Sequence, residues 1–286
     1  MLTVILGLSG ALVFGSGDFL GGMASKRMGA FLATGIAGIV GLFVLFGLIV
    51  FIPGEISSGT IWWGLLSGVA GALAILLLYA ALAIGPMSIL SPLGALISAI
   101  FPVIWALVVS HENLAWFGYV ALGIGALAIV LIAFTPEKNA VKPNLRGIIF
   151  ASVSGLLIGV FLVIMDQVPA NSGLYPLVFN RFVNIGIMFS AVGIMALIRW
   201  AHRTGLLGRD GKARADLVVG DSGRIDFKNG ILFALGCGVL DSVGNALMYP
   251  AGTIILAAIV LREKITKLQL VGMVLALSAA GLLAIS

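Results

Sequence analysis

Ten long apolar runs follow one another along this chain of 286 residues, and they limit what it can fold into. At least eight of them reach the roughly 20 apolar residues that a helix needs to cross a bilayer. Hydrocarbon offers no water to backbone N–H and C=O groups, so the runs must be helices, because they lack the alternation of barrel strands. The runs are Leu2–Ala24, Phe31–Ile52, Ile61–Ile84, Met87–Ser110, Leu114–Phe134, Arg146–Met165, Leu174–Arg199, Gly230–Met248, Pro250–Leu261 and Leu268–Ser286.

The composition indicates that lipid is the solvent. Hydrophobic residues make up 61% of the chain and charged residues 9%, with a mean hydropathy of +1.21. A soluble domain carries about 25% charged residues. The net charge of +5 does not indicate a nucleic-acid partner, because the basic residues lie in short loops between apolar runs. We expect a multi-pass protein of the plasma membrane, with the lipid bilayer as its surroundings.

The basic residues lie on one side of the predicted membrane layer. Of the 16 Lys and Arg residues, all but Arg181 follow runs one, five, seven and nine, or lie at the ends of these runs. The loops after runs two, four, six and eight contain none. We call the two sides the basic end and the opposite end. The positive-inside rule places the basic end in the cytoplasm and both termini outside.

The pattern breaks between Lys228 and Arg262, which should lie on the same side. Only 33 residues separate them, and Pro250–Leu261 has 12 residues, about 18 Å as a helix. Either Gly230–Leu261 forms a re-entrant hairpin, or residues are absent near Met248–Tyr249. Comparison with the first half favours an absence of about 15–20 residues.

The two halves of the chain share an order of features. Each contains a proline within a late apolar run, then an acidic turn (Glu112 or Glu263), then a further apolar run. Five runs per half is an odd number, so the second half enters from the other side, as in the inverted repeats of secondary transporters. We predict an all-α integral membrane protein with two inverted five-helix repeats and ten transmembrane helices. The repeats are 1–135 and 146–286, with a linker at 136–145, a soluble loop at 201–229, and helices eight and nine shortened by a deletion near 248–250.

Several short motifs resemble a known family. They are Gly15-Ser-Gly-Asp-Phe-Leu-Gly-Gly22, Ala80-Ala-Leu-Ala-Ile-Gly-Pro86, Ser172-Gly-Leu-Tyr-Pro176 and Tyr249-Pro-Ala-Gly-Thr253. In this order, over almost the whole chain, they resemble the EamA-type members of the drug/metabolite transporter superfamily, of the ten-helix type. The resemblance implies a central cavity, alternating access, and export or exchange of small metabolites such as amino acids. Family members usually have both termini in the cytoplasm, opposite to the orientation that the charge count predicts.

Two charges within the second half are candidates for a binding site, because a charged side chain inside a bilayer costs at least about 2.5–3.5 kcal/mol. Asp241, with Asn245 one helical turn further on, could bind a substrate amine or a proton, or could be a structural acid paired with Arg181. Arg181, with Asn184 beside it, could clamp a carboxylate, or could snorkel to the interface or pair with an acid.

Asp18 is the candidate charge of the first half. Glycines surround it, so it could face a cavity and bind a cation or proton, or it could pair with Lys26 or Arg27 near the surface. Tyr79, Trp105 and Tyr249 could line a pocket, although aromatic residues in spans more often pack or mark the interface.

Other features have structural interpretations. Asp166 ends a run just before a proline and is expected to be an interfacial, solvated acid. The small-residue pairs Gly17–Gly21, Gly64–Gly68 and Gly155–Gly159 are expected to be helix-packing seams.

The motifs of enzymes and ATPases are absent from the sequence, and we expect no catalytic residues, metal or cofactor. We therefore predict a secondary transporter of small metabolites. Its substrate-binding candidates are Asp241, Asn245, Arg181, Asn184, Asp18, Tyr79, Trp105 and Tyr249. Protonation of a buried acid would offer a route to proton coupling. The alternative is a non-transporting membrane scaffold or a truncated remnant of such a transporter.

Overall fold

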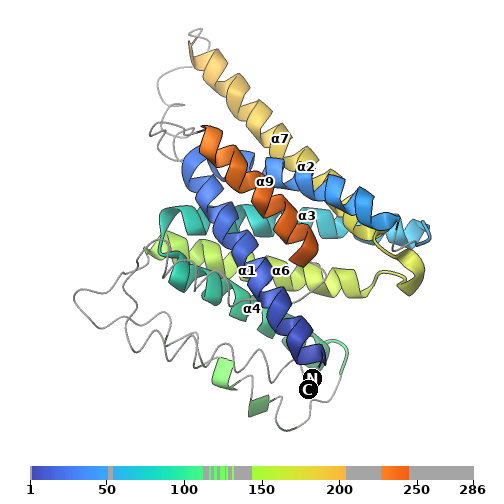
Figure 1. Ribbon diagram of the computed structural model, residues 1–286. Coiled ribbons are helices and arrows are strands. Elements are labelled where there is room, and N and C mark those ends of the chain that lie inside the picture. Colours follow the sequence, from blue (N-terminus) through green and yellow to red (C-terminus); the bar gives the residue numbers. More distant parts are fainter. Residues whose placement is uncertain are drawn as a thin grey trace.

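The computed structural model describes residues 2–50, 54–111, 144–203 and 227–244, together with isolated helical positions between 116 and 131. These parts form α-helices and one short 3-10 turn, and no strand occurs among them (Figure 1). The elements are α1 (Leu2–Met28), α2 (Ala30–Ile49), α3 (Ser58–Ile84), α4 (Met87–Val108), α6 (Leu145–Asp166), η1 (Ala170–Ser172), α7 (Tyr175–Arg203) and α9 (Phe227–Gly244).

Seven of the ten apolar runs are therefore confirmed as helices. Five of the described helices are long and apolar enough to cross a membrane, namely α2, α3, α4, α6 and residues Tyr175–Ile198 of α7. The chain is an α-helical, membrane-embedded protein. Runs five, nine and ten lie largely or wholly outside the described residues, as do the predicted deletion and the acidic turns at Glu112 and Glu263.

Two predicted boundaries differ from the structure. Helix α7 continues to Arg203 and α9 begins at Phe227, so both extend into the stretch 201–229 that was predicted as a soluble loop. Helix α6 begins at Leu145, the last residue of the predicted linker. Helices extend past their apolar runs because polar residues outside the hydrocarbon keep helical hydrogen bonds at little cost.

Side-chain caps define where α3 and α6 begin. Ser57 Oγ accepts a hydrogen bond from the backbone N–H of Thr60 (3.1 Å), and Thr60 Oγ1 accepts one from the N–H of Ser57 (3.2 Å). Asn144 Oδ1 accepts from the N–H of Gly147 (2.6 Å) at the start of α6. These caps satisfy backbone donors that a helix leaves unpaired in its first turn.

Helix α3 lies in the middle of the described helices. It packs against α1, α2, α4, α6 and α7, while α9 lies against α1 and α2 (Figure 1). Side chains of α1, α3, α4 and α9 meet in one apolar core that includes Phe19, Tyr79, Leu82, Leu90 and Cys237. This arrangement brings α9, from the second half of the chain, against two helices of the first half.

The three glycine pairs predicted as packing seams all lie at helix contacts. A Cβ atom at Gly21 would overlap the ring of Tyr79, so α1 and α3 could not approach as they do. Gly64–Gly68 face α7, and Gly155–Gly159 face α4. Small residues at such seams are the means by which helices pack closely in lipid.

Loops at the opposite end meet each other. The backbone N–H of Glu55 donates to the carbonyl oxygen of Asn171 (2.8 Å), and Thr60 Oγ1 lies 2.8 Å from Ser172 Oγ. These contacts join the loop after run two to the loop after run six, which alternation of the runs places on one side.

Contacts at the basic end follow the same alternation. The Arg27 guanidinium lies 4.4 Å from the centre of the Phe233 ring, so the end of α1 meets the start of α9. Asn144 Nδ2 donates to the carbonyl oxygen of Ile84 (3.3 Å), so the start of α6 meets the end of α3.

Candidate functional site

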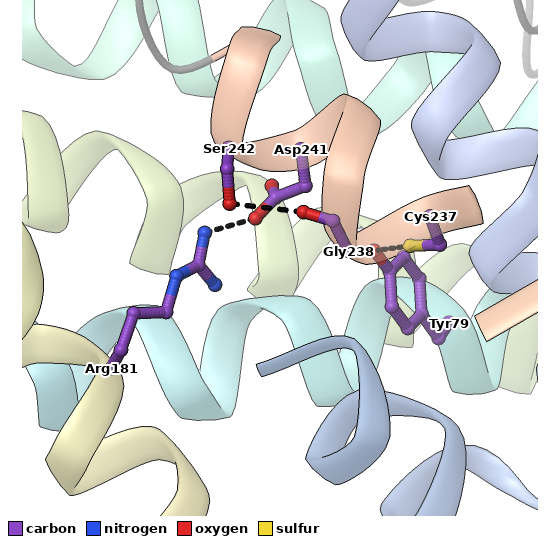
Figure 2. A network of polar contacts seen from close by, with 6 residues as sticks. All are labelled: Tyr79, Arg181, Cys237, Gly238, Asp241 and Ser242. Carbon is purple, nitrogen blue, oxygen red and sulfur yellow. Dashed lines mark hydrogen bonds and ion pairs between the residues drawn. The ribbon is translucent and has the colours of Figure 1, made fainter. Parts of the chain in front are cut away.

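An ion pair between Arg181 and Asp241 links α7 to α9 (Figure 2). The Arg181 guanidinium donates to the carboxylate of Asp241, and each residue is only 8% exposed. Arg181 lies about 9 Å along α7 from its first residue, and Asp241 about 21 Å along α9 from its own. Since α7 begins at the end without basic residues and α9 begins at the basic end, the pair lies within the helix bundle, nearer the start of α7.

Helix α2 leaves the space in which the two side chains meet. A Cβ atom at Gly41 would lie 2.7 Å from Ser242 Oγ and 3.2 Å from Arg181 Nε. The Ser242 hydroxyl donates a hydrogen bond to the carbonyl oxygen of Gly238 (2.9 Å), one turn earlier on α9. A side chain at residue 41 would therefore crowd Ser242 and Arg181 where Arg181 meets Asp241.

A second polar contact lies one turn away on α9. The Tyr79 hydroxyl lies 2.9 Å from Cys237 Sγ, and both residues are buried (Figure 2). A Cβ atom at Gly17, the residue before Asp18, would lie 3.4 Å from the backbone nitrogen of Asp241. Asp18 is 2% exposed, so both acids of the described helix interiors lie in one buried region shared by α1, α3 and α9.

Asn184 extends the site along α7. It lies one turn beyond Arg181, it is 2% exposed, and its Oδ1 atom would be 3.1 Å from a Cβ atom at Gly38. The structure thus brings five of the eight predicted site residues into neighbouring positions on four helices, namely Asp18, Tyr79, Arg181, Asn184 and Asp241.

Trp105 lies elsewhere. It lines a cleft of about 440 Å³ between α3, α4 and α6 at the opposite end, together with Trp63, Phe101 and Gln167. Neither Arg181 nor Asp241 lines this cleft. Asn245 and Tyr249 lie outside the described residues.

The remaining acid has its expected surroundings. Asp166 is exposed at the end of α6, where its carboxylate accepts a hydrogen bond from Gln167 Nε2 (3.4 Å). Across the ranges that the structure describes, no three His, Cys, Asp or Glu side chains gather as they would around a metal ion.

Sequence reasoning missed the glycines of α2. Gly35, Gly38 and Gly41 face α7 at a spacing of three residues, the spacing of one helix face. That spacing was a readable signal, but glycine is common throughout this chain, with 39 residues, so the signal did not stand out.

The chain matches no protein-family model, and no curated protein matches it. Fold and site together define an α-helical membrane protein with a buried Arg–Asp pair between two of its helices.

Proposed function

We propose that this protein is a secondary transporter of small metabolites, similar to EamA-type transporters, with ten helices in two inverted repeats in the plasma membrane. It exports amino-acid-like solutes by alternating access. The observation that carries the proposal is the buried Arg181–Asp241 pair among helices that are long and apolar enough to cross a membrane. Ionisable residues inside a membrane are costly and are typical of substrate and ion pathways.

The pair favours solutes that carry both charges. A ligand with one charge would separate the pair and leave the other charge buried and unpaired, which costs several kcal/mol. A zwitterion offers its carboxylate to Arg181 and its ammonium to Asp241, so both charges stay partnered. Asp18, in the same buried region, is the acid to which we assign proton coupling.

The test is transport by the purified full chain in liposomes. We expect uptake of radiolabelled L-amino acids to rise with an imposed proton gradient and to fall to background in Arg181→Ala and Asp241→Asn. Asp166→Asn, which removes an exposed acid, should keep the wild-type rate. Unchanged flux in both site variants would contradict the proposal.

A second candidate is a non-transporting membrane scaffold in which the ion pair only holds α7 and α9 together. The closed geometry of the pair favours it, because each charge already has its partner. A charge-swapped variant, with Arg181→Asp and Asp241→Arg, distinguishes between the transporter and the scaffold. If the swapped variant is as thermally stable as the wild type, and the wild-type protein itself shows no flux, the scaffold hypothesis is correct. If it recovers stability but loses a flux that the wild type shows, the pair binds substrate.

A further inference from the structure

Two buried polar atoms lie along the same helix faces as the ion pair and lack hydrogen bonds to any described residue. They are Asn184 Oδ1 on α7 and Thr34 Oγ1 on α2, and both residues are 2% exposed. A buried polar group without a partner costs about 1–3 kcal/mol, so each of these atoms requires an explanation.

The two atoms continue a polar column that starts at the ion pair. Gly41 faces Arg181, Gly38 faces Asn184, and Thr34 precedes Gly38 by one turn of α2. The column therefore runs from Arg181 and Asp241 through Asn184 to Thr34, towards the basic end. Because Gly38 and Gly41 have no side chains, Asn184 and Arg181 pack directly against the backbone of α2.

From this geometry we infer that Asn184 and Thr34 form a subsite for a neutral hydrogen-bond donor on the solute, such as a hydroxyl or an amide N–H. The inference deepens the proposed function and rests on it: the charged head binds at Arg181 and Asp241, and the side chain of the solute extends towards Asn184. A carboxamide oxygen can only accept a hydrogen bond, and a threonine hydroxyl can accept one, so both suit a donor.

The neighbouring charge argues against a metal cation in the same place. Arg181 lies one turn from Asn184 on the same face of α7, so a cation at Asn184 Oδ1 would meet a buried positive charge. A neutral donor meets no such repulsion.

Free L-threonine and free L-valine test the subsite, because they have the same shape and differ by a hydroxyl in place of a methyl group. Binding is measured as thermal stabilisation of the full chain in detergent, read with a thiol-reactive dye. Cys237 is the one cysteine of the chain and is buried, so the dye reports unfolding.

For the wild type we expect L-threonine to bind about three- to tenfold more tightly than L-valine, as one net neutral hydrogen bond allows. In Thr34→Val and Asn184→Leu this preference should disappear while L-valine binds as before. Equal binding of both amino acids by the wild type, or a preference kept in both variants, would overturn the subsite alone. If neither amino acid stabilised the wild type, both the subsite and the proposed zwitterion site at Arg181 and Asp241 would be overturned.

A stability measurement without ligand tests the same atoms independently. Thr60 is also buried, but its hydroxyl lies within hydrogen-bond distance of Ser57 and Ser172. Thr60→Val should therefore lower Tm by about 2–4 °C. Thr34→Val should leave Tm unchanged or raise it, because it removes a hydroxyl without a partner among the described residues. An equal loss in both variants would show that the Thr34 hydroxyl is already satisfied, and would overturn the subsite.

Discussion

At the scale of single residues, the Arg181–Asp241 pair combines two groups that are each unfavourable alone in lipid. Removing one partner leaves a buried charge, whereas removing both leaves only apolar volume to fill. The energetic role of the pair therefore lies in the coupling between the residues rather than in either one.

A double-mutant cycle measures this coupling. We expect Arg181→Met or Asp241→Leu alone to lower the free energy of unfolding by about 3–5 kcal/mol, and the double variant to lower it by clearly less than their sum. Thermal unfolding in detergent provides the four values. Additive effects would mean that the two side chains do not stabilise each other in solution.

At the scale of elements, α9 depends on close approach to its neighbours. A Cβ atom at Gly238 would lie 2.5 Å from the carbonyl oxygen of Ala37, a backbone atom that cannot move away without bending α2. The same approach places Ser242 and Asp241 beside α2, so the packing of α9 and the geometry of the site are linked.

Substituting this glycine tests the link. Gly238→Ala should destabilise the protein by about 1–3 kcal/mol, because the added methyl group overpacks the α2–α9 seam. Gly186→Ala on α7 is the matched control, since nothing lies within 4 Å of a Cβ atom there, and it should be neutral or slightly stabilising. Equal effects of the two substitutions in thermal unfolding would argue against close packing of α9.

Cys237 reports on the same helix. Its thiol is 0% exposed and lies one turn before Asp241, so it should react slowly with a maleimide in folded wild-type protein. Asp241→Asn removes the ion pair that ties α9 to α7 and should speed labelling about tenfold or more, because local opening becomes easier. Asp166→Asn should label like the wild type. If Asp241→Asn were also labelled at the wild-type rate, the ion pair would not hold α9 in place.

At the scale of the whole molecule, the loop contacts of the described residues lie at two ends, as alternating crossings predict. The contact between Glu55 and Asn171 lies at the end without basic residues, and the contact between Arg27 and Phe233 at the basic end. Charge then predicts which end faces the cytoplasm.

Labelling of intact cells tests this orientation. In a Cys237→Ala background, Ile56→Cys and Lys228→Cys place single thiols at exposed positions of the opposite and basic ends. A membrane-impermeant maleimide should label Ile56→Cys alone, and permeabilised cells should label both. The reverse pattern would give the orientation usual for EamA-type proteins, and external labelling of both positions would contradict alternating crossings.

Much of the fold could be predicted from the sequence, because the bilayer leaves few choices. Apolar length and the need to satisfy every backbone group determine that the runs are helices, and α3 and α4 follow their runs to within three residues at either end. Glycine spacing likewise predicted the Gly17–Gly21 and Gly64–Gly68 seams, since only small residues allow close approach in lipid.

For the site, the sequence by itself determined that Asp18, Arg181 and Asp241 need partners, because an isolated charge in lipid is too costly. It offered the Arg181–Asp241 pair as one of several possibilities. Only the tertiary structure showed that these two side chains pair, that Tyr79 contacts Cys237 one turn from Asp241, and that Trp105 lies in a separate cleft. It also showed that Thr34 and Asn184 carry buried polar atoms without a partner among the described residues. The reason is physical: which faces of distant helices meet depends on packing between them, and the periodicity of one helix does not contain that information.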